Sequence, residues 1–367
     1  QAQGKEGIHT LENDLFDLKI PIGFGYVKDD VADVKVPKIR VYEKEQVLYF
    51  PLETKPDFIS FDVGNNYLKT VSLEYPLPEL RAQLKSDPDP ISRIYATVAI
   101  AKKGNLEAVT ALTECLANEQ FWAVRLEAAQ QLATIKLDIA VTNLVAKIDD
   151  EDAFVRRAIV DELGKIKTPE TYAAIKQLVE TGDASYYVEA AACRALGGMT
   201  TASLKDKQEE AINLLTNVLN TRAGWNEVVR AGAIGGLSKM TDSTTALNTV
   251  LEYVKPGVPQ PLRLPSIRAL GAISQGQSEP NLTVIVEKLA ELSRETFFLT
   301  QVAIVGALSQ METVKAIGVL QDLANQSPDG RVKRMAEEGV QKVQKKIGSD
   351  GAVKQLRDEL EEVKKTN

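Results

Sequence analysis

Apolar and small residues along most of the chain follow one pattern of about 13 residues, which occurs eight times. The clear copies cover residues 123–135, 154–166, 187–199, 228–240 and 261–273, and weaker copies cover residues 91–103, 299–311 and 331–343. In every copy, the residues three and seven positions after the third residue are apolar or small, so they share one face of a predicted helix. Leu163 and Leu196 occupy the later position in two copies, and we expect both to be buried.

A second helical pattern precedes most copies, for example at residues 105–117, 137–148 and 168–180. Each unit is therefore a predicted helical hairpin, and successive copies start 31 to 41 residues apart. Hairpins that cannot bury their apolar face alone must stack on their neighbours, which indicates a solenoid over residues 77–347. The glycine pairs at 197–198 and 235–236 lie within predicted helices, where they would let helices approach closely.

The hairpin period and the turn sequences at 86–93 and 149–156 resemble the HEAT repeat family. The resemblance implies an α-α superhelix and says little about activity, because one repeat fold serves many functions.

Residues 1–76 follow a different pattern, rich in β-branched and aromatic residues. The predicted strands cover residues 16–26, 36–41, 46–52, 58–61 and 68–75. In the last of these, Val71, Leu73 and Tyr75 alternate with polar residues, which is typical of a strand with one buried face. Turn-forming residues at 62–66 precede it, and Pro76 and Pro78 end the module. The sequence thus predicts a β + α multidomain protein, with a small antiparallel β-sandwich before the solenoid.

The C-terminal segment, residues 348–367, has apolar residues at spacings of three and four, flanked by charged residues. This spacing predicts a short heptad-like helix. Two interpretations stay open: a helix that covers the apolar face of the last repeat, or the start of a coiled coil.

Composition narrows the classes of partner and compartment. The 367 residues carry a formal net charge of −7, which argues against nucleic acid or an anionic membrane as a partner. Apolar runs are too short to span a bilayer, and no signal-peptide pattern opens the sequence, so we expect a cytoplasmic protein. Cys115 and Cys193 hold apolar helical positions and are expected to be buried thiols.

No catalytic or metal-binding motif is present in the sequence. The one histidine, His9, is expected at the surface, and the two cysteines are 78 positions apart. Zinc sites draw on several His and Cys ligands, and no HExxH sequence occurs. We therefore predict no catalytic residue, no metal ligand and no cofactor for this chain.

Several segments resemble the post-catalytic region of M1-family zinc aminopeptidases. They are Gln1-Ala2-Gln3, Phe16-Asp17-Leu18-Lys19-Ile20-Pro21-Ile22, Phe61-Asp62-Val63-Gly64 and Glu79-Leu80-Arg81-Ala82-Gln83-Leu84. The resemblance implies that this chain is the C-terminal portion of a longer polypeptide. Zinc and the catalytic residues would lie in an upstream domain, since no position here matches them. The present chain would then close over and shape a chamber for peptide substrates.

The third residue of each copy, termed the column residue, is usually basic, as at Arg125, Arg156, Arg230 and Arg263. In HEAT repeats such residues usually bond turn carbonyls or neighbouring acids, so we expect a structural role. Positions one and five residues later share the outward face of the second helix, and they include Arg157, Asp161, Arg194, Arg268 and Arg334. Arg157, Arg194 and Arg268 are the candidate binding residues for a peptide carboxylate, although a merely solvated face also accounts for them.

Two other functions remain open at this stage. The chain could be a free-standing HEAT scaffold that binds a protein partner, or a HEAT protein that resembles bilin lyases and binds a tetrapyrrole. A zincin motif upstream of residue 1 would distinguish the aminopeptidase interpretation from both.

Overall fold

The computed structural model describes residues 16–29 and 31–366, except for the side chains of residues 202–203 and 349–366. The N-terminal motif and His9 lie outside the described residues. The chain divides into two compact units, Gln1–Ile159 and Val160–Asn367. The first unit holds a β-sheet together with the first helical hairpins.

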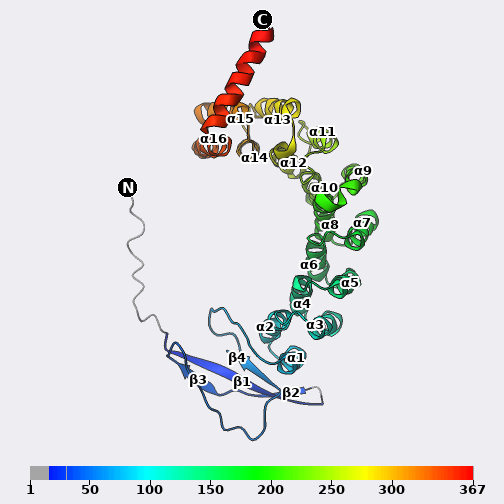
Figure 1. Cartoon of the computed structure of the whole chain (residues 1–367), viewed down its shortest axis with the longest axis vertical. Helices are drawn as coiled ribbons and strands as arrows, with labels where there is room; N and C mark the ends of the chain where they lie inside the picture. The colour runs from blue at the N-terminus through cyan, green and yellow to red at the C-terminus, as the bar shows by residue number, and fades with distance from the viewer. Residues whose placement is uncertain (1–15, 30, 367) are drawn as a thin grey trace. The chain divides into compact units, whose positions relative to one another are not determined.

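Four strands form one antiparallel sheet centred on β1 (Figure 1). The strands are β1 (Leu18–Lys28), β2 (Val31–Lys35), β3 (Lys38–Val41) and β4 (Phe58–Phe61). β2 and β3 pair with the same side of β1 and in the same register. Pro37 lies between these two strands, and its carbonyl accepts from the Ile22 N–H at 2.9 Å. β4 pairs with Ile22 to Gly25 of β1, along the edge opposite β2. Ile20, Ile22 and Phe24 form the core of this sheet.

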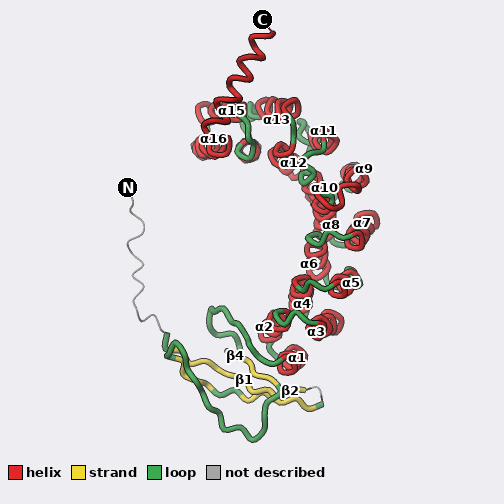
Figure 2. The backbone as a smooth tube through the Cα atoms, viewed as in Figure 1, coloured by secondary structure: helices red, strands yellow, loops and turns green. Residues whose placement is uncertain are grey.

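The antiparallel module is confirmed, but two of its predicted strands are wrong. Residues 46–52 and 68–75 pair with no strand in the described part of the chain, while β2 was not predicted (Figure 2). In the second segment Val71, Leu73 and Tyr75 are half-buried and the residues between them are exposed. A period of two therefore marks one-sided burial of an extended chain, which does not require a hydrogen-bonded neighbour. The described strands make one sheet rather than the two sheets of a sandwich.

Hydrogen bonds join the sheet to the first hairpin. Within the sheet module the Val63 N–H donates to the Pro21 carbonyl at 3.1 Å, and the adjacent Gly64 N–H donates to Asp89 of the hairpin at 3.3 Å. Ser60 donates to the buried Asp87, whose pKa is raised above its ordinary value by burial. Asp87 and Asp89 lie in the turn before the second helix, so this turn anchors the strand end.

Paired helices follow in the first unit, beginning where the proline boundary predicts. They are α1 (Leu77–Ser86), α2 (Pro90–Ala101), α3 (Leu106–Asn118), α4 (Trp122–Thr134), α5 (Asp138–Val145) and α6 (Ala153–Leu163), the last of which extends into the second unit. Local chemistry fixes several starts: Asp89 accepts from the Ile91 N–H, and Asn105 accepts from the Ala108 N–H. Such N-caps satisfy amide groups that have no partner within the helix.

The second unit continues the alternation. Its helices are α7 (Pro169–Thr181), α8 (Tyr186–Met199), α9 (Gln208–Thr221), α10 (Val228–Leu237), α11 (Thr244–Glu252), α12 (Gln260–Ile273), α13 (Glu279–Leu292), α14 (Phe298–Leu308), α15 (Val314–Gln326) and α16 (Gly330–Thr366). The even-numbered helices pack one after another and form a row on the inner side of the curve of this unit (Figure 1). Gly348 interrupts α16 with a φ of 69°, next to the predicted start of the tail segment.

Stacking of these hairpins buries the repeated apolar positions. Leu163 and Leu196 are fully buried, as predicted. Close approach of helices is confirmed at Gly197, where an added Cβ would lie 2.1 Å from the Gly236 carbonyl oxygen. It does not extend to Gly198, whose added Cβ would meet nothing within 4 Å.

Candidate functional site

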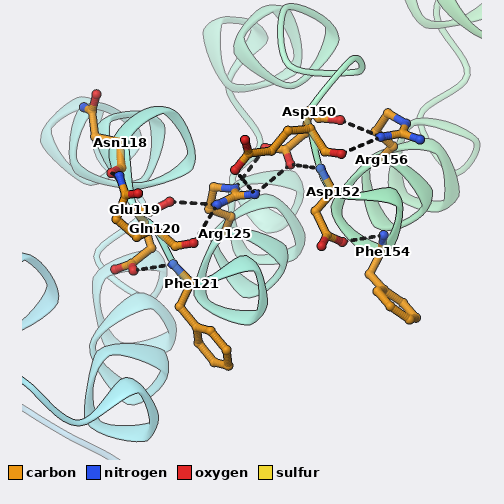
Figure 3. Close-up of polar contacts among 10 residues, drawn as sticks. Asn118, Glu119, Gln120, Phe121, Arg125, Asp150, Asp152, Phe154 and Arg156 are labelled. Carbon is orange, nitrogen blue, oxygen red and sulfur yellow. Dashed lines mark hydrogen bonds and ion pairs between the residues drawn. The ribbon is translucent and has the colours of Figure 1, made fainter.

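The column residues bond the turns of the stack, which confirms their predicted structural role. Arg125 of α4 donates to the carbonyls of Glu119 and Gln120 at 2.9 and 3.1 Å (Figure 3). It also forms a two-bond ion pair with Asp150, in the turn of the next hairpin, at 3.0 Å for both bonds. Burial opposes the charge of Arg125, but the bonds to Asp150 outweigh it and raise its pKa.

Other column residues repeat the arrangement with different chemistry. Arg93 donates to the Asp87 carbonyl at 2.7 Å and to Glu119 at 2.9 Å. Arg263 donates to the Val254 carbonyl at 2.8 Å and pairs with Glu295, also at 2.8 Å. Arg93, Arg125 and Arg263 therefore each link their own turn to the following one. Arg230 differs, since it pairs with Glu227 of its own hairpin at 2.6 Å.

One column position reverses the charges. Glu189 occupies it in α8 and accepts from the Asp183 N–H at 3.1 Å. Its cation is Arg222, which follows α9 and donates to Glu189 at 3.1 Å. An acid in the column thus receives an arginine from the next turn, which keeps the turns linked.

The predicted binding residues lie on the exposed face of the second helices. Arg157 is exposed on α6, and Arg194 and Arg268 are exposed on α8 and α12. Arg157 belongs to the first unit and the other two to the second unit. The face prediction is therefore correct for each residue, and their ligand stays a proposal.

Gly235 of α10 lies beside both arginines of the second unit. A Cβ added there would lie 3.0 Å from the Arg194 Cγ. Gly235 and Arg268 also line one open groove of about 300 Å³ between α10 and α12. Ala231, Ile234, Ser238, Pro265, Ala269 and Ala272 complete its lining.

The groove combines a mostly apolar lining with one cation, Arg268. A planar guanidinium bonds a carboxylate through two parallel N–H groups. Arg268 has no hydrogen bond or ion pair within the described part of the chain, so its donors remain open to a ligand. The sequence placed these arginines on one face but did not show that Gly235 separates them.

The described residues contain no recognisable metal-binding site. No group of three His, Cys, Asp or Glu side chains among them is arranged to hold a metal ion. Cys115 and Cys193 are buried free thiols, as predicted, and burial raises the pKa of each to about 12. In residues 16–29 and 31–366, no helix is both long and apolar enough to cross a bilayer.

Sequence analysis missed a second surface feature, at the N-terminal ends of the second helices. Exposed aromatic residues recur two to five positions before the column residue, at Phe121, Trp122, Phe154, Tyr186, Tyr187, Trp225 and Phe297. This recurrence is visible in the sequence once the column is aligned. It escaped notice because an aromatic residue beside a helix start is usually assigned to the core.

Comparisons with known proteins concern the repeats. A family model for HEAT repeats matches residues 77–146 and 111–186. A search of curated proteins finds no significant match. Among solved structures, human deoxyhypusine hydroxylase is similar at 18% identity over 73% of this chain and 96% of its own, with a TM-score of 0.32. The CpcE–CpcF phycocyanin lyase complex of Nostoc is similar at 18% identity over 76% and 98%, with a TM-score of 0.40.

A third similar structure is an aminopeptidase. Legionella pneumophila aminopeptidase A in complex with aspartic acid is similar at 12% identity over 89% of this chain and 46% of its own, with a TM-score of 0.44. At these identities and TM-scores, the likenesses assign no activity to this chain. The chain is a small antiparallel sheet followed by a HEAT-like solenoid.

Proposed function

We propose that this chain is the non-catalytic C-terminal portion of an M1-like zinc aminopeptidase, whose repeats close over and shape a peptide chamber. In this proposal an upstream domain supplies the metal and the catalytic groups. Among the described residues, no group of three His, Cys, Asp or Glu side chains is arranged to hold a metal ion. The solenoid acts in this proposal as a scaffold that presents the exposed face of its second helices to peptide substrates.

The observation that carries the proposal is the joint between the sheet and the first hairpin. Two segments that resemble the family are distant in sequence, yet Val63 of one bonds Pro21 of the other at 3.1 Å. Gly64 of the same segment bonds Asp89, in the turn before α2, at 3.3 Å. Residues that lock a sheet onto a helical turn have a physical reason to occur together. Their combined presence supports a shared architecture more strongly than each short motif alone.

The native polypeptide tests this proposal. An antibody raised against residues 77–347 would capture the native protein from its source. We expect a polypeptide heavier than the 40.1 kDa of this chain, with one zinc per molecule and hydrolysis of aminoacyl-anilides. The isolated chain, assayed beside it, is expected to show neither zinc nor hydrolysis. A captured polypeptide of about the same mass without zinc or activity would favour the free-standing scaffold instead.

A further inference from the structure

An exposed aromatic cluster lies at the N-terminal ends of α4 and α6, all within the first unit. It consists of Phe121, Trp122 and Phe154, termed here the aromatic edge. The rings of Trp122 and Phe154 stack with centroids 4.9 Å apart, and Phe121 lies 5.9 Å from Trp122. Phe154 is 61% exposed, and Phe121 and Trp122 are more than a third exposed. Grouped aromatic side chains on a surface are typical of interaction sites, where they supply most of the binding energy.

Acidic side chains hold this edge in place. The Glu119 carboxylate accepts from the Phe121 N–H at 2.9 Å, and the Asp152 carboxylate accepts from the Phe154 N–H at 2.8 Å. Figure 3 shows both phenylalanine rings directed away from the column arginines. The backbone that carries the aromatic edge is therefore held by these bonds, which lowers the entropy cost of binding.

The charge that faces solvent beside the edge is negative. The turn at 149–152 is a run of four acids, and the Glu151 side chain is 82% exposed. The cation paired with it, Arg125, is only 5% exposed. Ion pairing thus leaves the positive charge inside the turn and the negative charge at the surface. Phosphate groups of nucleic acids or anionic lipids would be repelled there.

A later repeat shows which chemistry suits this aromatic position. Phe298 lies three residues before its column residue, as Trp122 does. The guanidinium of Arg331, from the next hairpin, stacks over the Phe298 ring at 4.0 Å from the centroid. Asp329 pairs with the same arginine at 2.7 Å. Ring, acid and arginine together make a cation–π contact supported by a carboxylate.

We propose that the aromatic edge docks a basic segment of a partner protein, in which arginine side chains alternate with apolar ones. The guanidinium groups lie over the open rings near Glu151, and the apolar side chains cover the remaining ring surface. The aromatic edge includes none of the exposed arginines invoked above, so the inference stands whether or not the chain belongs to an aminopeptidase.

Tryptophan fluorescence offers a direct test in the full chain. The chain has two tryptophans, so the background variant Trp225→Phe leaves Trp122 as the reporter. The probe is a 12-residue peptide of alternating arginine and leucine, with a matched peptide of glutamate and leucine. We expect the arginine peptide to change Trp122 fluorescence in a saturable, salt-sensitive manner and the glutamate peptide to leave it unchanged.

Variants identify the surface by fluorescence anisotropy of the labelled peptide. Phe154→Ala and Glu151→Gln should each weaken binding, the first by about tenfold, equivalent to 1.4 kcal/mol. Tyr49→Ala removes an aromatic residue that is 91% exposed outside the edge, and it should leave affinity unchanged. Equal binding of both peptides, equal losses in the Tyr49→Ala variant, or no binding of the arginine peptide would overturn the proposal. Tighter binding of single-stranded DNA or anionic vesicles would also overturn it.

Discussion

Two adjacent glycines in α8 have opposite surroundings. A Cβ at Gly197 would collide with backbone of α10, whereas a Cβ at Gly198 would project into open space. Sequence analysis assigned both to close packing, because the one-letter pattern of a glycine pair is the same on either side of a helix. Only the rotation of the helix against its neighbour separates the two positions.

Alanine substitutions measure this difference. Gly197→Ala should destabilise the fold by about 1–3 kcal/mol or more, because overpacking forces the α10 backbone to move. Gly198→Ala is the matched control, and it should be neutral or stabilising by up to about 1 kcal/mol, since alanine favours helix. Chemical denaturation of both variants provides the comparison. Equal effects would show that α8 does not approach α10 as described.

The buried thiols supply a second prediction. Cys115 and Cys193 should react with an aromatic disulfide reagent at pH 8 only after unfolding, because their thiolates form with a pKa of about 12 in the folded chain. An ordinary cysteine ionises near pH 9 here, so the unfolded chain loses these protons first. Stability should therefore fall as pH rises from about 9 to 12. A rapid reaction of either thiol under native conditions would contradict their burial.

Among the elements, the helices followed the sequence pattern more closely than the strands. In each hairpin, the second helix begins within three residues of its predicted start, because stacking buries the same positions in each repeat. Strand pairing depends on which edges meet, which a period of two does not encode. The reversed column pair of Glu189 and Arg222 also escaped prediction, since its arginine lies outside the repeated pattern.

The link between Arg263 and Glu295 tests the turn ladder. Hydrogen bonds from Arg263 hold the pKa of Glu295 below its ordinary value, so the folded chain binds fewer protons than the unfolded chain. The stabilisation is present above the unfolded pKa of about 4.5 and is lost as pH falls through the folded pKa. Glu295→Gln should cost about 1.5–3 kcal/mol at pH 7 and much less near pH 3, as measured by urea denaturation.

A matched control separates this from general charge loss. Glu252 pairs with Lys255 on the surface of the same unit, with both side chains more than half exposed. Glu252→Gln should change stability by less than about 1 kcal/mol at either pH. If both variants lose stability equally, the column does not lock the turns.

At the scale of the whole molecule, the sequence predicted the order of sheet, hairpins and tail. The sheet and the first hairpins belong to one compact unit, in which Ser60 bonds Asp87 and Gly64 bonds Asp89 across residue 76. The domain boundary at residue 76 stays a prediction. Pro76 and Pro78 mark where one kind of secondary structure ends. They do not encode the side-chain hydrogen bonds that form across that point. The positions of the exposed arginines were predictable from periodicity. The groove beside Arg268 was not, because it forms only when α10 packs against α12.

The central claim, that the repeats face peptide substrates, is tested most directly by enzyme kinetics of the full-length polypeptide. Arg194→Ala and Arg268→Ala should raise KM for peptides with a free carboxylate by about tenfold or more, as a lost charged hydrogen bond costs about 1.5–3 kcal/mol. KM for aminoacyl amides should not change. Arg294→Ala, an exposed arginine in the turn after α13, is the control. Equal losses on both substrate types, or none on either, would contradict the claim.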